Sequence, residues 1–557
     1  MAGVAVAEEE MVRHQRGRFL GLLGLAAAFP TLQAVLFVAV NFMGAEGLSP
    51  QASAVWPYDS YNDMRWLLVY HNSWATYLGG LVLAVGLRGL LSGALVSLAW
   101  PGAVPHPGFR RILLRNLGVA AMTAAIVSPF AALAVAAGVV SLSWFVFASV
   151  GPMLLLAPFL QRAAVGPGWW RGLPSAALVG WSLLDFVVIT FAGAIVWRVP
   201  GWWTVLIAAA CGAVNGLLWN RSVRAAVHPA RVRWRRVPVA PIAIVIALVT
   251  PLVMQGVTSG GARQRNNFRP PVLTARLPPS VPYAVIVLGG HNSAYDGVPA
   301  VDPAVQQFSY AGLDDAGQPR PYDTLNTHQS LESSADLLSR QVDALHARTR
   351  RPVALLGESE GAMVARTYLR NRPNTPVRAL LMFSPLVRAA RVYYPPPDAD
   401  RGWGLAAGWQ LRGIFAAVNL VTGGADSPDE PFIRSLQDEG PFYRFEAMCT
   451  IPNVRAIAFL PTVTAAELPP GPFANIPVFE VPSLHGGLLS RDVVNDRLVD
   501  FLAGEHINAP RREYSLYQLV GAAWQAPGLA PAINPVWRGK VSPGPPFTPQ
   551  RLCQKQG

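Results

Sequence analysis

The sequence predicts a protein of two unlike parts: an α-helical transmembrane domain of seven spans, then an α/β domain with a mostly parallel sheet. The chain of 557 residues has a mean hydropathy of +0.31 and only 14% charged residues, which is too apolar for a soluble protein of this size. The apolar excess lies almost entirely before Gly256. After that point, apolar runs of strand length alternate with segments of helical periodicity.

Seven stretches in the first half are long enough to cross roughly 30 Å of hydrocarbon. Tryptophans stand at several of their ends, where interfacial anchors are expected. The first stretch is too long for a cleaved signal peptide, and no small-residue cleavage site follows it. The predicted spans, which together make a domain over 19–256, are residues 19–43, 75–100, 117–138, 143–160, 174–197, 202–219 and 238–256.

Arginine placement predicts the orientation of these spans. The amino-terminal segment 1–18 and the connections after the second, fourth and sixth spans are rich in arginine, whereas the alternate connections carry little positive charge. Basic connections stay in the cytoplasm, so the amino terminus is expected to be cytoplasmic and everything after Gly256 extracytoplasmic in the cell membrane. These arginines explain most of the net charge of +13. We therefore expect contacts with anionic membrane lipids and no binding of nucleic acid.

Two charged residues fall near the middle of predicted spans, Arg88 in the second and Asp185 in the fifth. A lone charge at the bilayer centre costs several kcal/mol by most estimates, so each should have a partner. We expect Arg88 and Asp185 to pair between helices. The alternative is that the second span is shifted to 66–87, which would leave Arg88 at the cytoplasmic surface.

Residues 357–361 read Gly-Glu-Ser-Glu-Gly, between an apolar run at 353–356 and a helical segment at 362–369. In a strand–turn–helix setting this pattern is a nucleophile elbow. The turn is so sharp that side chains two residues either side of Ser359 would collide with neighbouring backbone. Glycine at Gly357 and Gly361 removes these collisions and leaves the Ser359 hydroxyl exposed above the sheet.

The second half alternates strands and helices. This order indicates a mostly parallel sheet covered by helices on both faces. Strands are expected at 283–288, 305–310, 353–356, 377–383, 454–459 and 476–481, and helices at 331–348, 362–369 and 492–502.

This part of the chain resembles the α/β-hydrolase superfamily of serine esterases and lipases. The resemblance covers roughly 273–502, within a domain predicted at 273–506, and does not extend to the membrane half. It rests on four features in the order that the fold uses. They are an oxyanion-type loop at 289–292 (Gly-Gly-His-Asn), the elbow, a strand end at 383–385 (Phe-Ser-Pro), and a histidine loop at 483–487 (Ser-Leu-His-Gly-Gly).

The resemblance implies a role for each of these residues. Ser359 would be the nucleophile and His485 the base that removes its proton, since a serine hydroxyl is a poor nucleophile at neutral pH. Backbone amides would stabilise the oxyanion: that of Glu360, and one from the 290–292 loop, either His291 or Asn292. No cofactor is expected.

The acid of the triad departs from the family pattern. The loop where it usually stands, 461–470, contains no aspartate, and its only carboxylate is Glu467. We expect Glu467 to orient His485. Asp398 and Asp400 are alternatives, because some members of the fold place the acid after the preceding strand.

The strand pattern is interrupted between about 386 and 452. This insertion is rich in aromatic residues, and 404–420 is apolar enough to be an interfacial helix. It is expected to be a lid that shapes an apolar pocket, or alternatively a small cap with its own core. Residues 257–272 are predicted to be a linker, and the proline-rich segment 507–557 a wrapped or partly disordered extension.

The chain has three cysteines. Cys211 lies inside the sixth span, whereas Cys449 and Cys553 would both be outside, where a disulfide can persist. Two cysteines at this spacing leave open whether they are bonded. No pair has the spacing of zinc ligands, and no metal centre is predicted.

The leading hypothesis is a membrane-anchored extracytoplasmic serine hydrolase that acts on a lipid or other acyl ester through an acyl-enzyme. An acyltransferase of envelope lipids would use the same intermediate and resolve it with an alcohol. A transporter or receptor that keeps the fold for binding only is the third possibility, because the expected aspartate is missing and fold alone does not establish function.

Overall fold

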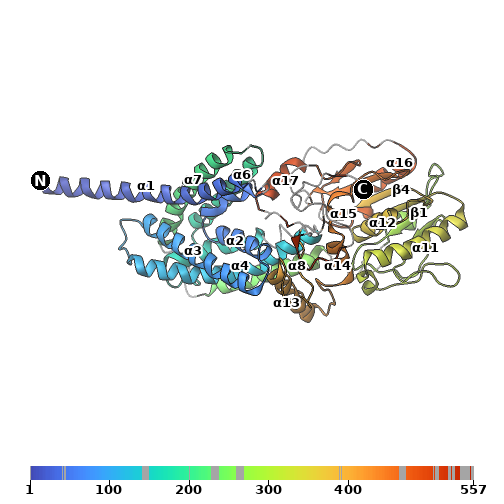
Figure 1. Cartoon of the computed structure of the whole chain (residues 1–557), viewed down its shortest axis with the longest axis horizontal. Helices are drawn as coiled ribbons and strands as arrows, with labels where there is room; N and C mark the ends of the chain where they lie inside the picture. The colour runs from blue at the N-terminus through green and yellow to red at the C-terminus, as the bar shows by residue number, and fades with distance from the viewer. Residues whose placement is uncertain are drawn as a thin grey trace.

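The computed structural model describes residues 2–40, 42, 45–140, 150–199, 201–227, 237–258, 269–387, 389, 392–462, 464, 472–483, 485–505, 507, 514–524, 528–529, 533–539 and 552–553. The amino-terminal helices and the sheet lie at opposite ends of an elongated molecule (Figure 1). Helices α13 and α17 lie between the two ends, so that segments from the second half contact the first (Figure 1).

Five described helices are long and apolar enough to cross a membrane. Their outward faces carry large apolar side chains: Val82 is 74% exposed and Leu32 is 67% exposed. A surface of this kind is unfavourable in water and suits contact with lipid. The first part of the chain therefore has the character of a multi-pass membrane domain. The five helices are α1 (Ala2–Ala39), α3 (Trp74–Ala99), α4 (Phe109–Val140), α6 (Ala176–Val196) and α7 (Trp203–Val227).

The fourth and seventh predicted spans do not meet the same criteria among the described residues. The fourth lies partly outside the described residues, and its described part belongs to α5 (Gly151–Val165), which has 15 residues. The seventh coincides with α8 (Val239–Thr258). The described part of the chain thus supports five spans where the sequence predicts seven.

Helices α1 and α7 pack closely because α7 presents glycine at their contact. A Cβ atom placed on Gly212 would lie 2.6 Å from the carbonyl oxygen of Ala26. Small residues at such crossings let backbones approach, which replaces the hydrophobic driving force that is absent between helices in lipid.

The connection after α1 is buried inside the helical domain instead of forming an exposed loop. It consists of the 3₁₀ helix η1 (Glu46–Ser53) and α2 (Tyr58–Val69), most of whose residues are buried. Side chains of α7 satisfy its backbone: Asn215 donates to the carbonyl of Pro50 (3.1 Å), and the Trp219 indole donates to that of Ser53 (3.0 Å).

This buried connection corrects the predicted pairing of Arg88 with Asp185. The Arg88 guanidinium instead binds the carboxylate of Asp63 through two nitrogens, with the Nη2–Oδ1 distance 2.7 Å, and lies 3.6 Å from Asp59. Asp185 accepts from the backbone amide of Val55 (3.2 Å). The reason is that α2 enters the bundle and brings two carboxylates to Arg88.

The second part contains a six-stranded, wholly parallel sheet in the order β2-β1-β3-β4-β5-β6. The parallel sheet with intervening helices confirms the α/β class predicted for this part. The strands are β1 (Ala284–Leu288), β2 (Val305–Gln307), β3 (Val353–Glu358), β4 (Val377–Phe383), β5 (Arg455–Pro461) and β6 (Val478–Val481).

Alternate residues of each strand serve two separate cores, as the strand period of two requires. Ile286 and the strand residues on the same face of the sheet pack against α11 (Leu331–Thr349) and α12 (Glu360–Asn371). Val285 and the strand residues on the opposite face pack against α16 (Asp492–Leu502). Shorter helical elements of this part are α10 (Pro271–Thr274), η3 (Thr324–His328) and η5 (Leu488–Ser490).

The insertion between β4 and β5 is helical and reaches the membrane domain. It comprises α13 (Leu405–Thr422), α14 (Pro431–Asp438) and α15 (Gly440–Phe445). Gln410 of α13 donates to the Tyr77 hydroxyl (3.1 Å) and accepts from that of Ser128 (2.9 Å). The Ala406 amide donates to the imidazole of His71 (2.7 Å). Helix α13 is therefore fixed to α3, to α4 and to the connection between α2 and α3.

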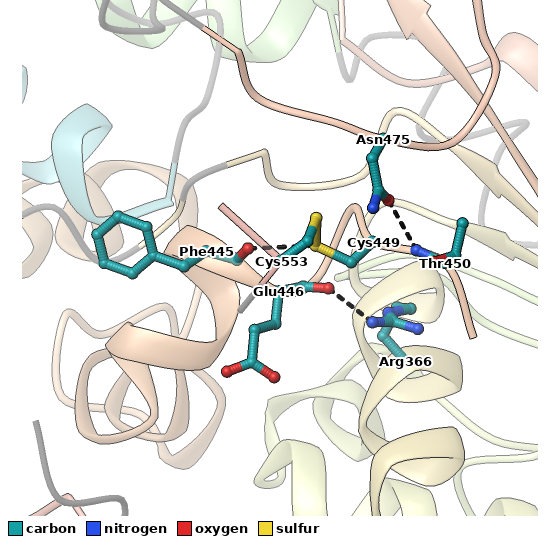
Figure 2. Close-up of a disulfide and its surroundings, with 7 residues drawn as sticks. All are labelled: Arg366, Phe445, Glu446, Cys449, Thr450, Asn475 and Cys553. Atoms are coloured by element: carbon teal, nitrogen blue, oxygen red, sulfur yellow. Dashed lines mark hydrogen bonds between the residues drawn. A yellow bond between two sulfur atoms is a disulfide. The ribbon is translucent and has the colours of Figure 1, made fainter. Parts of the chain in front are cut away.

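The carboxyl-terminal segment also enters the helical domain. Helix α17 (Tyr514–Ala522) packs on α6, and the buried Trp524 after it stacks on Phe186 and donates to the Thr190 hydroxyl (2.8 Å). A disulfide between Cys449 and Cys553 ties the end of the chain to the sheet-containing part (Figure 2). The described parts of the predicted extension are thus packed against both halves of the molecule.

Candidate active site

Ser359 stands on a sharp turn between β3 and α12. Its backbone has φ 53° and ψ −114°, a conformation that non-glycine residues adopt rarely and at a cost. The two flanking glycines are required by space. A Cβ atom on Gly357 would lie 2.5 Å from the amide nitrogen of Ala362, and one on Gly361 would lie 2.6 Å from the carbonyl oxygen of Leu288.

The Ser359 hydroxyl lies 2.9 Å from Nε2 of His485, within hydrogen-bond distance. His485 belongs to the loop that follows β6. Burial lowers the pKa of His485 to about 4. The imidazole is therefore neutral at physiological pH, which is the form able to accept a proton from a hydroxyl.

The loop that carries His485 is held by side chains at the ends of two neighbouring strands. The buried carboxylate of Glu358, the last residue of β3, accepts from the amides of Gly487 and Leu488, the latter at 3.3 Å. The Ser384 hydroxyl, just after β4, accepts from the amide of Gly486 (3.3 Å). Glu358 is a functional candidate that the sequence analysis missed, although its place beside the nucleophile at the end of a buried strand could have indicated it.

The predicted acid, Glu467, lies outside the described residues. Of the alternatives, Asp398 is exposed and pairs with Arg538 at 2.7 Å. Among the described contacts neither Asp398 nor Asp400 bonds to His485. The carboxylate that the described structure brings to the histidine loop is that of Glu358.

The 289–292 loop also lies against the nucleophile. A Cβ atom on Gly290 would lie 3.1 Å from the Ser359 Cβ atom. The Asn292 amide is occupied, since it donates to the Thr327 hydroxyl (3.0 Å). The amide of His291 has no acceptor among the described residues, and that of Glu360 is at the first turn of α12, where no helical partner exists. Of the predicted oxyanion donors, His291 and Glu360 remain available.

The His291 side chain lies between two carboxylates. Its Nδ1 is 3.2 Å from Glu360 and its Nε2 is 3.3 Å from Glu430 of the insertion. Burial alone would lower the pKa of His291, but the hydrogen bond and charge of Glu360, with Glu430 and Asp426, raise it to about 9. Burial raises the pKa of Glu360 to about 7, in spite of the opposing bond to His291.

His291 also belongs to a group of four possible metal ligands that the sequence analysis did not predict. One ligand atom each from His291, His328, Asp426 and Glu430 lie within 4.8 Å of one another. The two imidazole rings are 4.6 Å apart, centroid to centroid. The four residues come from three separate loops and helices, so no sequence spacing signals the group.

Comparison of the chain with models of known protein families and with curated proteins finds no match. The class of protein therefore follows from the fold: an apolar multi-helix membrane domain joined to a parallel-sheet α/β domain. Chemically, a strained serine bonded to a neutral imidazole, beside two free amides, is an arrangement suited to acyl transfer.

Proposed function

We propose that this protein is a membrane-anchored serine hydrolase that cleaves a lipid or other acyl ester through an acyl-enzyme. The observation that carries the proposal is the 2.9 Å approach of the Ser359 hydroxyl to His485 Nε2 at a strained strand–helix turn. A nucleophile and base within hydrogen-bond reach, with the base held by a further group, is the signature of nucleophilic catalysis.

In the first step Ser359 Oγ attacks the carbonyl carbon of the ester while its proton passes to His485 Nε2. The carbonyl oxygen takes up the negative charge, and the amides of His291 and Glu360 donate to it. Amide donors of this kind each contribute about 10²–10³-fold to the rate. The tetrahedral intermediate then collapses, and His485 gives its proton to the departing alcohol.

In the second step His485 takes a proton from water, and the resulting hydroxide attacks the acyl group on Ser359. The acid is released and the serine recovers its proton from the imidazole. Glu358 holds the histidine loop in place throughout by accepting from two of its amides. We propose that Glu467 orients His485, and the steps above do not depend on its charge.

We place the amino terminus in the cytoplasm, with seven spans and the α/β domain outside the cell membrane. The arginine-rich connections support this orientation. The disulfide between Cys449 and Cys553 supports it independently, because disulfides persist in oxidising compartments and are rare in the cytosol.

The insertion favours a lipid substrate and a lid role. Helix α13 is bonded to the membrane domain and also exposes apolar side chains: Leu420 is 88% exposed and Trp409 is 44% exposed. The loop after α13 reaches the oxyanion loop, where Asp426 accepts from Asn292 (3.2 Å). The same insertion therefore touches both the membrane domain and the site, as a lid over a lipid substrate would.

The test is covalent labelling of membranes with a fluorophosphonate probe. Wild type should be labelled, Ser359→Ala should not, and His485→Ala should react at least about 10³-fold more slowly. Ser333→Ala, which removes an exposed hydroxyl on α11, is the matched control and should label as wild type. A wild-type protein that stays unlabelled would overturn the proposal in favour of a binding domain.

A further inference from the structure

We propose that His291, His328, Asp426 and Glu430 form a zinc site that joins the insertion to the oxyanion loop. The four side chains offer two imidazole nitrogens and two carboxylate oxygens. Zinc takes this mixture of ligands in a tetrahedral arrangement. The site lies beside the proposed active site but plays no part in the chemistry described above.

The spacing of the ligand atoms fits one small ion. Zinc bonds of about 2.0 Å in a tetrahedron separate the ligands by roughly 3.3 Å. Nε2 of His291 is 3.3 Å from Glu430 and Nδ1 of His328 is 3.0 Å from Glu430, which is close to that spacing. One ligand atom from each of the four residues lies within 4.8 Å of the others, so a modest closing of the group would bring all four to one ion.

A buried oxygen without a hydrogen bond gives a second, independent indication. Glu430 is 7% exposed, and its Oε2 has no hydrogen-bond partner although His328 Nδ1 is only 3.0 Å away. A buried carboxylate oxygen is normally satisfied, and leaving it unpaired is costly. Neighbouring ligands of one metal ion lie this close together without a hydrogen bond between them.

The surroundings complete the pattern of a metal site. Nδ1 of His291 faces the fully buried carboxylate of Glu360 at 3.2 Å, which leaves Nε2 directed to Glu430. Histidine ligands usually donate their second nitrogen to a carboxylate in this way. In the described part of the chain no arginine or lysine pairs with Glu360, Glu430 or Asp426, so a divalent cation would offset their charge.

An ion here would connect three segments distant in the sequence. His291 belongs to the oxyanion loop after β1, His328 ends η3, and the two carboxylates lie between α13 and α14. The ion would fix the insertion relative to the His291 amide. Its role is structural positioning.

The experiment uses full-length protein purified in detergent without a histidine tag. The protein is stripped with a chelator, incubated with zinc chloride and desalted, and its metal content is then measured by mass spectrometry. Wild type should retain about one zinc per chain. Glu430→Gln and His328→Ala should lose most of it, whereas His346→Ala, which removes a histidine of α11 outside the site, should retain it.

Thermal unfolding provides a second readout, independent of metal analysis. Zinc should raise the melting temperature of stripped wild type and leave that of Glu430→Gln unchanged, while magnesium and calcium should have little effect. The proposal is overturned if stripped wild type retains no more zinc than Glu430→Gln, or if magnesium stabilises it equally. Ser359→Ala should bind zinc normally, so that failure of the hydrolase proposal and failure of this one can be told apart.

Discussion

The Ser359 hydroxyl and Nε2 of His485 lie 2.9 Å apart, although 126 residues separate them in the chain. The parallel sheet explains this proximity. Ser359 follows β3 and His485 follows β6, and the carboxyl ends of parallel strands meet at one edge of a sheet. The intervening residues include the insertion and three further strands, β4, β5 and β6, so the pair is made only when these strands have assembled beside β3.

The pH dependence of esterase activity should reflect the partly buried environment of His485. The neutral imidazole is the active form, and burial lowers its pKa to about 4. The acid limb of kcat/KM should therefore fall near pH 4 and not near pH 6.5. A pH–rate profile with a soluble ester measures this, and an acid limb close to 6.5 would show that His485 is solvated in the working enzyme.

The same depressed pKa predicts an effect on stability. The unfolded chain protonates this histidine near pH 6.5, whereas the folded protein does so only near pH 4. The unfolded state thus binds more protons between these values, and the free energy of unfolding should fall as the pH drops from about 6.5 to 4. This contribution should be absent in His485→Ala, and an unchanged pH dependence in that variant would contradict it.

Glu358 should act by positioning the histidine loop. Glu358→Ala leaves two amides without an acceptor, and we expect kcat/KM to fall about 10²-fold together with a lower melting temperature. Glu358→Gln keeps an oxygen in the same place and should remain within about tenfold of wild type. If Gln is as damaging as Ala, the negative charge of Glu358 is required and its role is electrostatic.

Alanine at Gly357 should damage the nucleophile turn. The added Cβ would meet the backbone of Ala362 at 2.5 Å, so we expect a loss of about 2 kcal/mol in the free energy of unfolding, with loss of fluorophosphonate labelling. Gly413→Ala is the matched control, because nothing lies within 4 Å of its added Cβ on helix α13. It should stabilise the protein by about 0.5–1 kcal/mol.

A double-mutant cycle tests the partner of Arg88. The pair is partly buried, with side chains 12% and 22% exposed, and Arg88→Met would leave Asp63 without its cation, so this variant should destabilise the helical domain. Its effect should couple to Asp63→Asn by about 0.5–3 kcal/mol and add to that of Asp185→Asn within about 0.5 kcal/mol. Coupling to Asp185 and not to Asp63 would restore the pairing predicted from the sequence.

The sequence predicted those features that depend on neighbouring residues. Apolar stretches of sufficient length indicated the five helices that are long and apolar enough to cross a membrane, and the alternation of strands and helices indicated the parallel sheet. The turn at Ser359 could be inferred because its steric demand falls on Gly357 and Gly361, each two residues away. A histidine after the last strand was expected near the serine because the fold places both at one edge.

The sequence alone did not reveal pairings that depend on how distant segments pack. Mid-span placement predicts that Arg88 pairs with Asp185, yet the burial of η1 and α2 brings Asp63 to Arg88. The contact of Glu358 with the histidine loop has no signal in the sequence because it depends on where Gly487 comes to lie.

From the sequence by itself follow the apolar helices, the α/β alternation and the strained serine turn, because each is set by side-chain sterics and hydropathy over a few neighbouring residues. The tertiary structure decided which groups meet: Trp524 inside the helical domain, α13 against α3 and α4, and two histidines beside Glu430. Such contacts depend on the packing of the whole chain, because a buried polar group takes whichever partner that packing brings within reach.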